Sequence, residues 1–133
     1  KDNEKELERK SYEVMEMLNL DNMAKSYARE LSGGQKKLLE LGRAIVKNPK
    51  VLLLDEPLAG VNPKLAEQIL EIINNLIEEG KTVLMVEHNI EAVMKVSERV
   101  VVMAEGEVIA DGAPNDIRAD QKVIDAYLGS GNE

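Results

Sequence analysis

The sequence predicts an α/β fold, in which helices flank a parallel sheet, with an antiparallel C-terminal hairpin at the edge of the sheet and a small helical subdomain at the N-terminus. Two short apolar runs, Val51–Leu54 and Thr82–Val86, alternate with segments of helical periodicity, as the strands of a parallel sheet do. Glu105-Gly106 separates two further apolar runs and indicates a tight turn between antiparallel strands.

Helical patterns fill the first third of the chain. Residues 3–18 place apolar side chains at helical spacing along an otherwise charged segment, and a short helix is expected around residues 22–28. Ser32 and Gln35 stand at the two positions of a capping box, which predicts that the next helix begins directly after Ser32. That helix should end at about Lys47, because an Asn-Pro pair follows it.

The remaining elements follow from the same signals. The uniformly apolar run Val51–Leu54 predicts a strand that is buried on both faces. Pro63 begins a long helix that should end at Gly80, before the second apolar strand. Beyond that strand we expect a helix, two strands and two short helices: Ile90–Val96, Arg99–Met103, Val108–Ala110, Pro114–Ala119 and Gln121–Tyr127. The expected organisation is a helical subdomain over 1–49, a sheet core over 50–129 and a flexible tail over 130–133.

Composition limits the class of protein. The chain has 133 residues and 44% apolar residues, but no Phe or Trp, so we expect an aliphatic core. A formal net charge of −8 argues against nucleic acid or an anionic membrane surface as a direct partner. The absence of cysteine excludes disulfides and thiolate metal sites. No apolar run approaches the roughly 18 residues of a membrane span, and the first residues lack a signal-peptide pattern, so we expect a soluble cytoplasmic protein.

The glycine pair after Ser32 is a candidate anion site. The first N–H groups of a helix have no intrahelical partner, and the helix dipole makes that end positive. Gly33 and Gly34 have no side chains, so a phosphate could approach these donors closely, with Ser32 and Gln35 as further polar contacts. The alternative is an ordinary helix cap in which glycine only permits a tight entry.

Asp55-Glu56 follows the first buried strand and is a candidate metal and acid–base site. The carboxyl end of a strand in an α/β sheet is where such proteins place ligand chemistry. The Asp55 carboxylate suits Mg²⁺, and Glu56 could accept a proton from an attacking water. The alternative is a pair of solvent-facing acids at a strand end.

His88 follows the second buried strand and could hydrogen-bond a phosphate oxygen or orient a water molecule. The alternative is a polar residue beside the cap of the next helix, and the lack of a second His or any Cys argues against metal ligation. Gly80-Lys81-Thr82 matches the end of a phosphate-binding loop, but it follows a helix and precedes a strand, and Asn75 stands where the first glycine should be. We therefore interpret Gly80 as a helix C-cap.

Together these motifs resemble the ATP-binding subunit of ABC transporters, a P-loop NTPase, over residues of roughly 5 to 129. The four matching motifs are the LSGGQ signature at Leu31–Gln35, the Walker B strand with its catalytic glutamate at Val51–Glu56, the D-loop at Leu58–Asn62 and the switch histidine at His88. Within the family, the stretches Ala59–Pro63 and Val123–Gly129 resemble branched-chain amino acid importers, and lipopolysaccharide-export ATPases share parts of them.

The resemblance covers only the C-terminal half of such a domain. The family's Walker A loop, adenine-stacking aromatic and Q-loop glutamine all precede the signature, and residues 1–30 contain no glycine-rich loop. Most family members have Asp at the last D-loop position, where this chain has Asn62, so communication between sites through that residue is in question. The resemblance therefore implies a partial domain that lacks ATPase activity by itself.

In a complete domain, the resemblance implies a head-to-tail dimer of ATPase subunits with two ATP molecules between them. Asp55 would hold Mg²⁺, Glu56 would polarise the attacking water and His88 would contact the γ-phosphate. The residues that would contact the γ-phosphate of the other subunit, in trans, are Ser32, Gly33, Gly34 and Gln35.

ATP-driven closure would energise solute import, in particular of branched-chain amino acids, through membrane-spanning subunits that hold the ATPase on the inner face of the cell membrane. A non-catalytic regulatory or interaction module that retains the fold is the alternative. Because the Walker A strand is missing, Val51–Leu54 and Thr82–Val86 should have partly uncovered apolar faces, so we expect the partial domain to self-associate.

Overall fold

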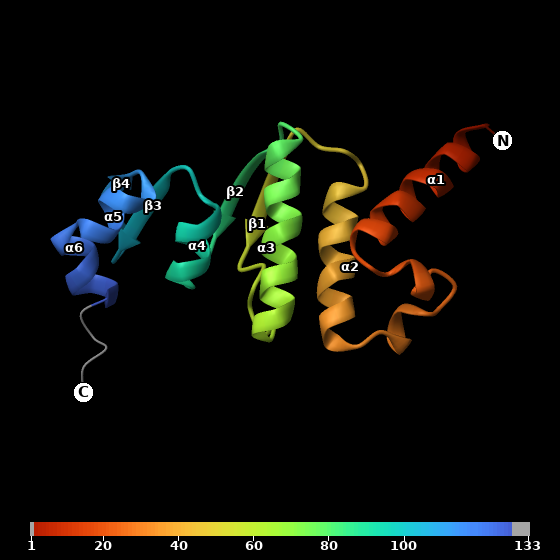
Figure 1. The fold of residues 1–133 in the computed structure, drawn as a ribbon, viewed down its shortest axis with the longest axis horizontal. Helices are drawn as coiled ribbons and strands as arrows, with labels where there is room; N and C mark the ends of the chain where they lie inside the picture. The colour runs from red at the N-terminus through yellow and green to blue at the C-terminus, as the bar shows by residue number, and fades with distance from the viewer. Residues whose placement is uncertain (1, 129–133) are drawn as a thin grey trace. The chain divides into compact units, whose positions relative to one another are not determined.

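The computed structural model describes residues 2–128, which form two compact units that divide after Glu87 (Figure 1). In chain order, the first unit contains α1 (Asp2–Met17), the 3₁₀ turns η1 (Asp21–Met23) and η2 (Ala28–Glu30), α2 (Gly33–Ile45), β1 (Val51–Asp55), α3 (Pro63–Glu78) and β2 (Thr82–Val86). The second contains α4 (Ile90–Val96), β3 (Val100–Ala104), β4 (Glu107–Gly112), α5 (Pro114–Ala119), α6 (Gln121–Val123) and the π-helical turn η3 (Ile124–Leu128). The expected subdomain boundary near residue 49 stays a prediction, and the expected tail lies outside the described residues.

The helices of the first unit pack through aliphatic side chains. α1 packs against α2: a Cβ on Gly42 would come within 3.4 Å of Val14 Cγ1 in α1 and within 2.7 Å of Leu18 Cδ1 directly after it. The predicted inner face of α2, Leu38, Leu41 and Ile45, is buried. This pattern confirms the expected aliphatic core, because apolar residues three and four apart share one side of a helix.

The prediction of a short helix around residues 22–28 is wrong. The chain forms two separate 3₁₀ turns instead, because Tyr27 adopts an extended backbone conformation (φ −71°, ψ 144°) that interrupts helical hydrogen bonding. The Glu30 carboxylate then accepts a hydrogen bond of 3.1 Å from the Tyr27 N–H. α2 also ends at Ile45, slightly before the expected Lys47.

β1 and β2 form a parallel pair in the first unit, with a register that runs from Val51 opposite Thr82 to Asp55 opposite Val86. α3 lies along this pair and contacts β2 (Figure 1). On one face Leu52 is only 3% exposed, whereas on the other Leu53 is 73% exposed. The prediction that β1 is buried on both faces is therefore wrong for this chain, and the expectation of partly uncovered strands is confirmed.

The second unit is built on an antiparallel hairpin. β3 and β4 pair from Val100 opposite Gly112 to Ala104 opposite Glu107, with an irregularity after Val102. The inner side of the hairpin packs with the following helices around a core of three buried residues, Val100, Ile117 and Val123.

Two expectations about this hairpin unit differ from the structure. The predicted hairpin exists, but among the described residues it forms a two-stranded sheet of its own instead of an edge of the parallel sheet. The helix expected over Gln121–Tyr127 changes to π-helical hydrogen bonding after Val123. The Tyr127 hydroxyl donates a hydrogen bond to the Met103 carbonyl, which ties this last turn to β3.

Candidate functional site

α2 begins with the capping box that the sequence predicts. The Gln35 N–H donates to Ser32 Oγ at 3.2 Å, and the Ser32 N–H donates to Gln35 Oε1 at 2.9 Å. The first intrahelical bond of this turn runs from the Lys36 N–H to the Ser32 carbonyl. The N–H groups of Gly33 and Gly34 precede that bond, so they belong to the positive end of the helix dipole.

The two glycines have different surroundings. A Cβ on Gly33 would meet nothing within 4 Å, so this residue leaves the helix end open. A Cβ on Gly34 would lie 2.8 Å from Leu65 Cδ2 of α3, so the second glycine permits α2 and α3 to approach. Sequence reasoning assigned both glycines to anion access and missed this packing role of Gly34.

Asp55 and Glu56 lie at the carboxyl end of β1, as predicted. Asp55 is the last residue of the strand and is exposed opposite Val86, whose carbonyl accepts a 2.8 Å hydrogen bond from the Glu56 N–H. Glu56 itself has a positive φ of 45°, which turns the chain out of the strand. A non-glycine residue in this conformation is uncommon and is often associated with function.

Two residues that sequence reasoning missed hold the turn after β1. Lys37 of α2 donates from Nζ to the Glu56 carbonyl at 3.4 Å, which links the signature helix to the acidic turn. Glu87 accepts a 2.8 Å hydrogen bond from the Leu58 N–H at Oε1, which ties the same turn to the end of β2. Both residues are polar and adjoin motifs, but only the tertiary fold indicates these contacts.

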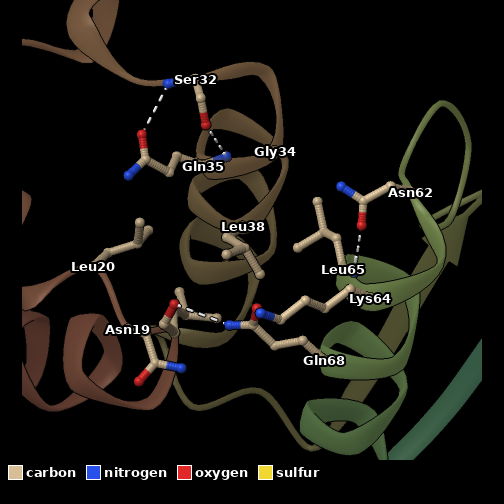
Figure 2. Close-up of a pocket in the computed structure, with 11 residues that line it drawn as sticks. Asn19, Leu20, Ser32, Gly34, Gln35, Leu38, Asn62, Lys64, Leu65 and Gln68 are labelled. Carbon is tan, nitrogen blue, oxygen red and sulfur yellow. Dashed lines mark hydrogen bonds between the residues drawn. The ribbon is translucent and has the colours of Figure 1, made fainter.

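A pocket of about 290 Å³ lies between the start of α2, the start of α3 and the segment that follows α1 (Figure 2). Its polar lining includes Ser32, Gln35, Asn62, Lys64 and Gln68, and Leu18, Leu20, Leu38 and Leu65 supply apolar walls. Asp55 and Glu56 are not among the lining residues. The structure therefore brings part of the signature motif together with α3 in a pocket that does not include the two carboxylates.

α3 begins at Pro63 as predicted, and Asn62 is its N-cap. The Asn62 Oδ1 accepts a 2.9 Å hydrogen bond from the Leu65 N–H, as Figure 2 shows. The residue that departs from the family's usual D-loop aspartate therefore still supplies a capping oxygen. A capping amide keeps the hydrogen bond but not the charge of a carboxylate.

His88 is the first residue of the second unit and is exposed. The adjacent Asn89 caps α4 by accepting a 3.1 Å hydrogen bond from the Ala92 N–H at Oδ1. The cap of α4 is thus Asn89, so His88 is not needed for that purpose. The proposed contact of His88 with a phosphate stays a prediction.

The segment Gly80-Lys81-Thr82 is a helix end, as interpreted from the sequence. Gly80 has a φ of 87°, and the N–H groups of Gly80 and Lys81 donate to the carbonyls of Ile77 and Leu76 at the end of α3. These are the hydrogen bonds of a glycine C-cap, in which backbone donors point back toward the helix. The segment is therefore not arranged as a phosphate-binding loop.

Asp55 is the candidate ligand for a cation that the sequence predicts in this region. Among residues 2–128, no three side chains of His, Cys, Asp or Glu gather in a group that could hold a metal ion. Mg²⁺ often takes only one or two protein carboxylates and completes its coordination with substrate phosphates and water. The exposed carboxylate at the end of β1 fits that kind of shared site and does not fit a site made by protein ligands alone.

No helix within the described part of the chain has both the length and the apolar character to cross a membrane.

Comparisons with known protein families match both ends of the chain. A family model described as "ABC transporter" matches residues 1–59, and one described as "Branched-chain amino acid ATP-binding cassette transporter" matches residues 107–132. The first match includes the signature and Walker B motifs, and the second includes β4 and the helices that follow it. These matches agree with the resemblance drawn from the motifs.

Similar curated proteins are about twice as long as this chain. "Probable branched-chain amino acid transport ATP-binding protein LivG" of Archaeoglobus fulgidus is 45% identical over 96% of this chain and 49% of its own length. The protein of the same description from Methanocaldococcus jannaschii is 38% identical over 95% of this chain and 51% of its own. Lipopolysaccharide export system ATP-binding protein LptB of Escherichia coli is 38% identical over 92% of this chain and 51% of its own.

Solved structures give the same picture. The ADP conformation of an ATP-binding cassette of an ABC transporter superposes with a TM-score of 0.83 at 38% identity, and the match covers 94% of this chain and 51% of that one. A nucleotide-free cassette superposes with a TM-score of 0.81 at 37% identity over the same shares. The chain thus spans about half the length of the relatives that it matches. The family models, the curated relatives and the solved structures thus all match the chain to part of an ABC transporter ATP-binding cassette.

Proposed function

We propose that this chain supplies the signature helix and the Walker B carboxylates of an ABC transporter ATPase. The observation that carries the proposal is the link between α2 and the turn after β1, where Lys37 donates to the Glu56 carbonyl. One compact unit thereby holds a capped, glycine-bearing helix end and a strand end with two acids. Anion-binding donors and metal-binding carboxylates are the two requirements of nucleotide chemistry.

The two carboxylates, Asp55 and Glu56, have different proposed roles. Asp55 would hold Mg²⁺, which supplies charge neutralisation at the phosphates when it is bound. Glu56 would orient and polarise the attacking water as a general base. The positive φ of Glu56 and the hydrogen bonds on its N–H and carbonyl support this assignment, because they fix the backbone of the residue at the end of the strand.

The helix end would act on ATP held by a second cassette subunit, in a head-to-tail dimer. Gly33 and Gly34 would offer N–H donors to the γ-phosphate, and Ser32 and Gln35 would flank them while they cap the helix. His88 would contact the γ-phosphate of the ATP bound by its own subunit. Within residues 2–128 no glycine-rich loop joins a strand to a following helix, so the remaining nucleotide contacts would come from elsewhere in the complete protein.

The proposed role of the complete protein is to energise the import of branched-chain amino acids. Membrane-spanning subunits would hold it on the cytoplasmic face of the membrane. The family match over residues 107–132 and the 45% identity with the Archaeoglobus fulgidus LivG favour this solute over lipopolysaccharide. The chain alone would be inactive as an ATPase.

The inactivity of the isolated chain is tested by ATP hydrolysis. This chain, its Glu56→Gln variant and the complete Archaeoglobus fulgidus relative are assayed with Mg²⁺ under the same conditions. We expect phosphate release by both forms of the chain to stay at background. Turnover by the chain at the rate of the complete relative, abolished by Glu56→Gln, would contradict the proposal that the other half is needed.

The trans contact is tested by calorimetry between this chain and the complete relative saturated with ATP. Ser32→Asp keeps an N-cap oxygen but adds a negative charge beside the phosphate, so binding should weaken while the helix stays capped. Ser11→Asp on exposed α1 is the matched control and should leave the affinity unchanged. Equal affinities for all three forms would favour the alternative, a regulatory module that binds without its signature.

A further inference from the structure

The turn that follows β1 is strained at its first residue. Glu56 has a φ of 45°, in the left-handed region that residues other than glycine rarely adopt. Such a conformation persists only where the surrounding contacts determine it. The contacts that hold this turn therefore decide the direction in which the Glu56 side chain leaves the backbone.

Two main-chain hydrogen bonds set the path of the turn. The Glu56 N–H donates to the Val86 carbonyl at 2.8 Å, and the Ala59 N–H donates to the Glu56 carbonyl at 3.1 Å. The first continues the pairing of two parallel strands, and the second is the bond of an ordinary β-turn. Because many sequences make such bonds, they do not by themselves account for the left-handed residue at the start of the turn.

A third contact depends on one side chain. Glu87, the residue directly after β2, accepts a 2.8 Å hydrogen bond at Oε1 from the Leu58 N–H. Leu58 is only 7% exposed, and the N–H of a buried residue costs free energy when it lacks an acceptor. A carboxylate also makes a stronger bond than a neutral acceptor. Glu87 thus fastens the middle of the turn to the end of β2.

Lys37 is the rival residue for this purpose, and geometry disfavours it. Its Nζ donates to the Glu56 carbonyl at 3.4 Å in an exposed contact. That distance lies beyond the usual range for an N–H···O bond. An exposed lysine also loses much rotamer freedom when it is held in one position. The shorter and partly buried bond of Glu87 is therefore the stronger restraint.

We propose that Glu87 is a positioning residue for Glu56. Its carboxylate holds Leu58, and through it the turn, so that Glu56 leaves β1 in its left-handed conformation. This role rests on the proposed function, in which Glu56 polarises the attacking water. A general base must lie within hydrogen-bond reach of the proton that it accepts, so a released turn would take the carboxylate out of reach. Glu87 acts through the backbone of the turn and not on the water itself.

Hydrogen exchange of the Leu58 amide, followed by NMR on this chain, tests the first step. Glu87→Leu removes the acceptor, so the Leu58 N–H should exchange about tenfold faster or more than in the parent chain. Glu87→Gln keeps a side-chain carbonyl oxygen and should restore the rate to within about threefold of the parent. Glu71→Leu, at an exposed position of α3, is the matched control and should leave the rate unchanged.

The backbone of Glu56 gives a second reading, which the loss of a merely local bond at Leu58 would not move. The three-bond coupling between the amide and α protons of Glu56 depends on its φ. We expect Glu87→Leu to shift this coupling, because the released turn samples other conformations, whereas Glu87→Gln should keep the parent value. Lys37→Met removes the rival contact and should also keep it.

Two outcomes would overturn the proposal. One is an unchanged Glu56 coupling in Glu87→Leu and in the milder Glu87→Ala variant, with circular dichroism showing that each is folded. The other is a turn that is released by Lys37→Met and not by Glu87→Leu, which would assign the role to Lys37. Neither measurement uses nucleotide, so failure of the proposed ATPase role would leave both readings unchanged.

Discussion

The two faces of the β1–β2 pair differ although their residues are chemically alike. Leu52 and Leu53 are adjacent leucines of the same strand, yet Leu52 is buried in the core of the first unit and Leu53 is largely exposed. α3 lies along the pair and covers one side of it. A hydrophobic residue is suited to burial, but it is buried only where another element of the chain, here α3, packs against its side of the sheet.

The hairpin of the second unit has the same asymmetry with a different exposed side. Val100 is buried, while Val101 and Met103 are exposed. Here a charged pair accompanies the exposed apolar residues: Arg99 donates to the carboxylate of Asp111, which lies opposite Val101. The exposed face of β1–β2, formed by Val51, Leu53, Leu84 and Val86, ends in Thr82 and Asp55 instead, so the two exposed sheet faces differ in how readily they would accept another chain.

The largest effect is expected from truncation of Leu52, and truncation of Leu53 on the opposite face is the comparison. Leu52→Ala should lower the free energy of unfolding by about 2–5 kcal/mol, because it removes a buried side chain and leaves a cavity. Leu53→Ala should change it by less than about 0.5 kcal/mol, since the side chain is already in water. Urea unfolding followed by circular dichroism measures both. Equal losses would mean that both faces are covered in solution.

A smaller effect is expected at the helix that covers the sheet. Asn62→Ala removes the N-cap oxygen that binds the Leu65 N–H and should lower the free energy of unfolding by about 1 kcal/mol. Asn75→Ala, at an exposed interior position of the same helix, should raise stability slightly because alanine has the higher helix propensity. Thermal unfolding of the two variants would therefore shift in opposite directions. Shifts of the same sign would contradict the assigned cap.

The local elements were predictable because their signals are local. Ser32 and Gln35 predict a capping box, Gly80 predicts a C-cap, and the structure contains both. Thr82–Val86 as a strand follows from an apolar run between turn signals, and it is confirmed at both ends. In each case the residues that give the signal are also the ones that make the hydrogen bonds.

The long-range hydrogen bonds were not predictable, because sequence signals of this kind are local. No sequence signal says that Lys37 reaches the Glu56 carbonyl or that Glu87 binds the Leu58 N–H, since nineteen and twenty-nine positions separate those partners. The burial of β1 on both faces was predicted from composition and fails because the described chain provides a cover for only one face. The roles of Asp55 and Glu56 rest on family resemblance and stay proposals.

The smallest effect concerns the charged pair on the exposed side of the hairpin. The hydrogen bond from Arg99, aided by its charge, holds the pKa of Asp111 below its ordinary value of 3.8. Since the folded pKa is the lower one, the pair stabilises the fold above the ordinary pKa, and this contribution is lost as the pH falls through the folded pKa. The exposed position of the pair keeps the effect small and sensitive to salt.

Carbon-detected NMR titration of the Asp111 carboxyl group measures this pair directly. Arg99→Gln should raise the pKa of Asp111 toward its ordinary value, because the donor and most of the local positive charge are removed. Arg118→Gln is the matched control, since Arg118 pairs with Glu91 and not with Asp111. If the pKa of Asp111 were unchanged by Arg99→Gln, the pair would not form in solution. The exposed hairpin face would then lack its charge protection, and the contrast with the exposed face of β1–β2 would disappear.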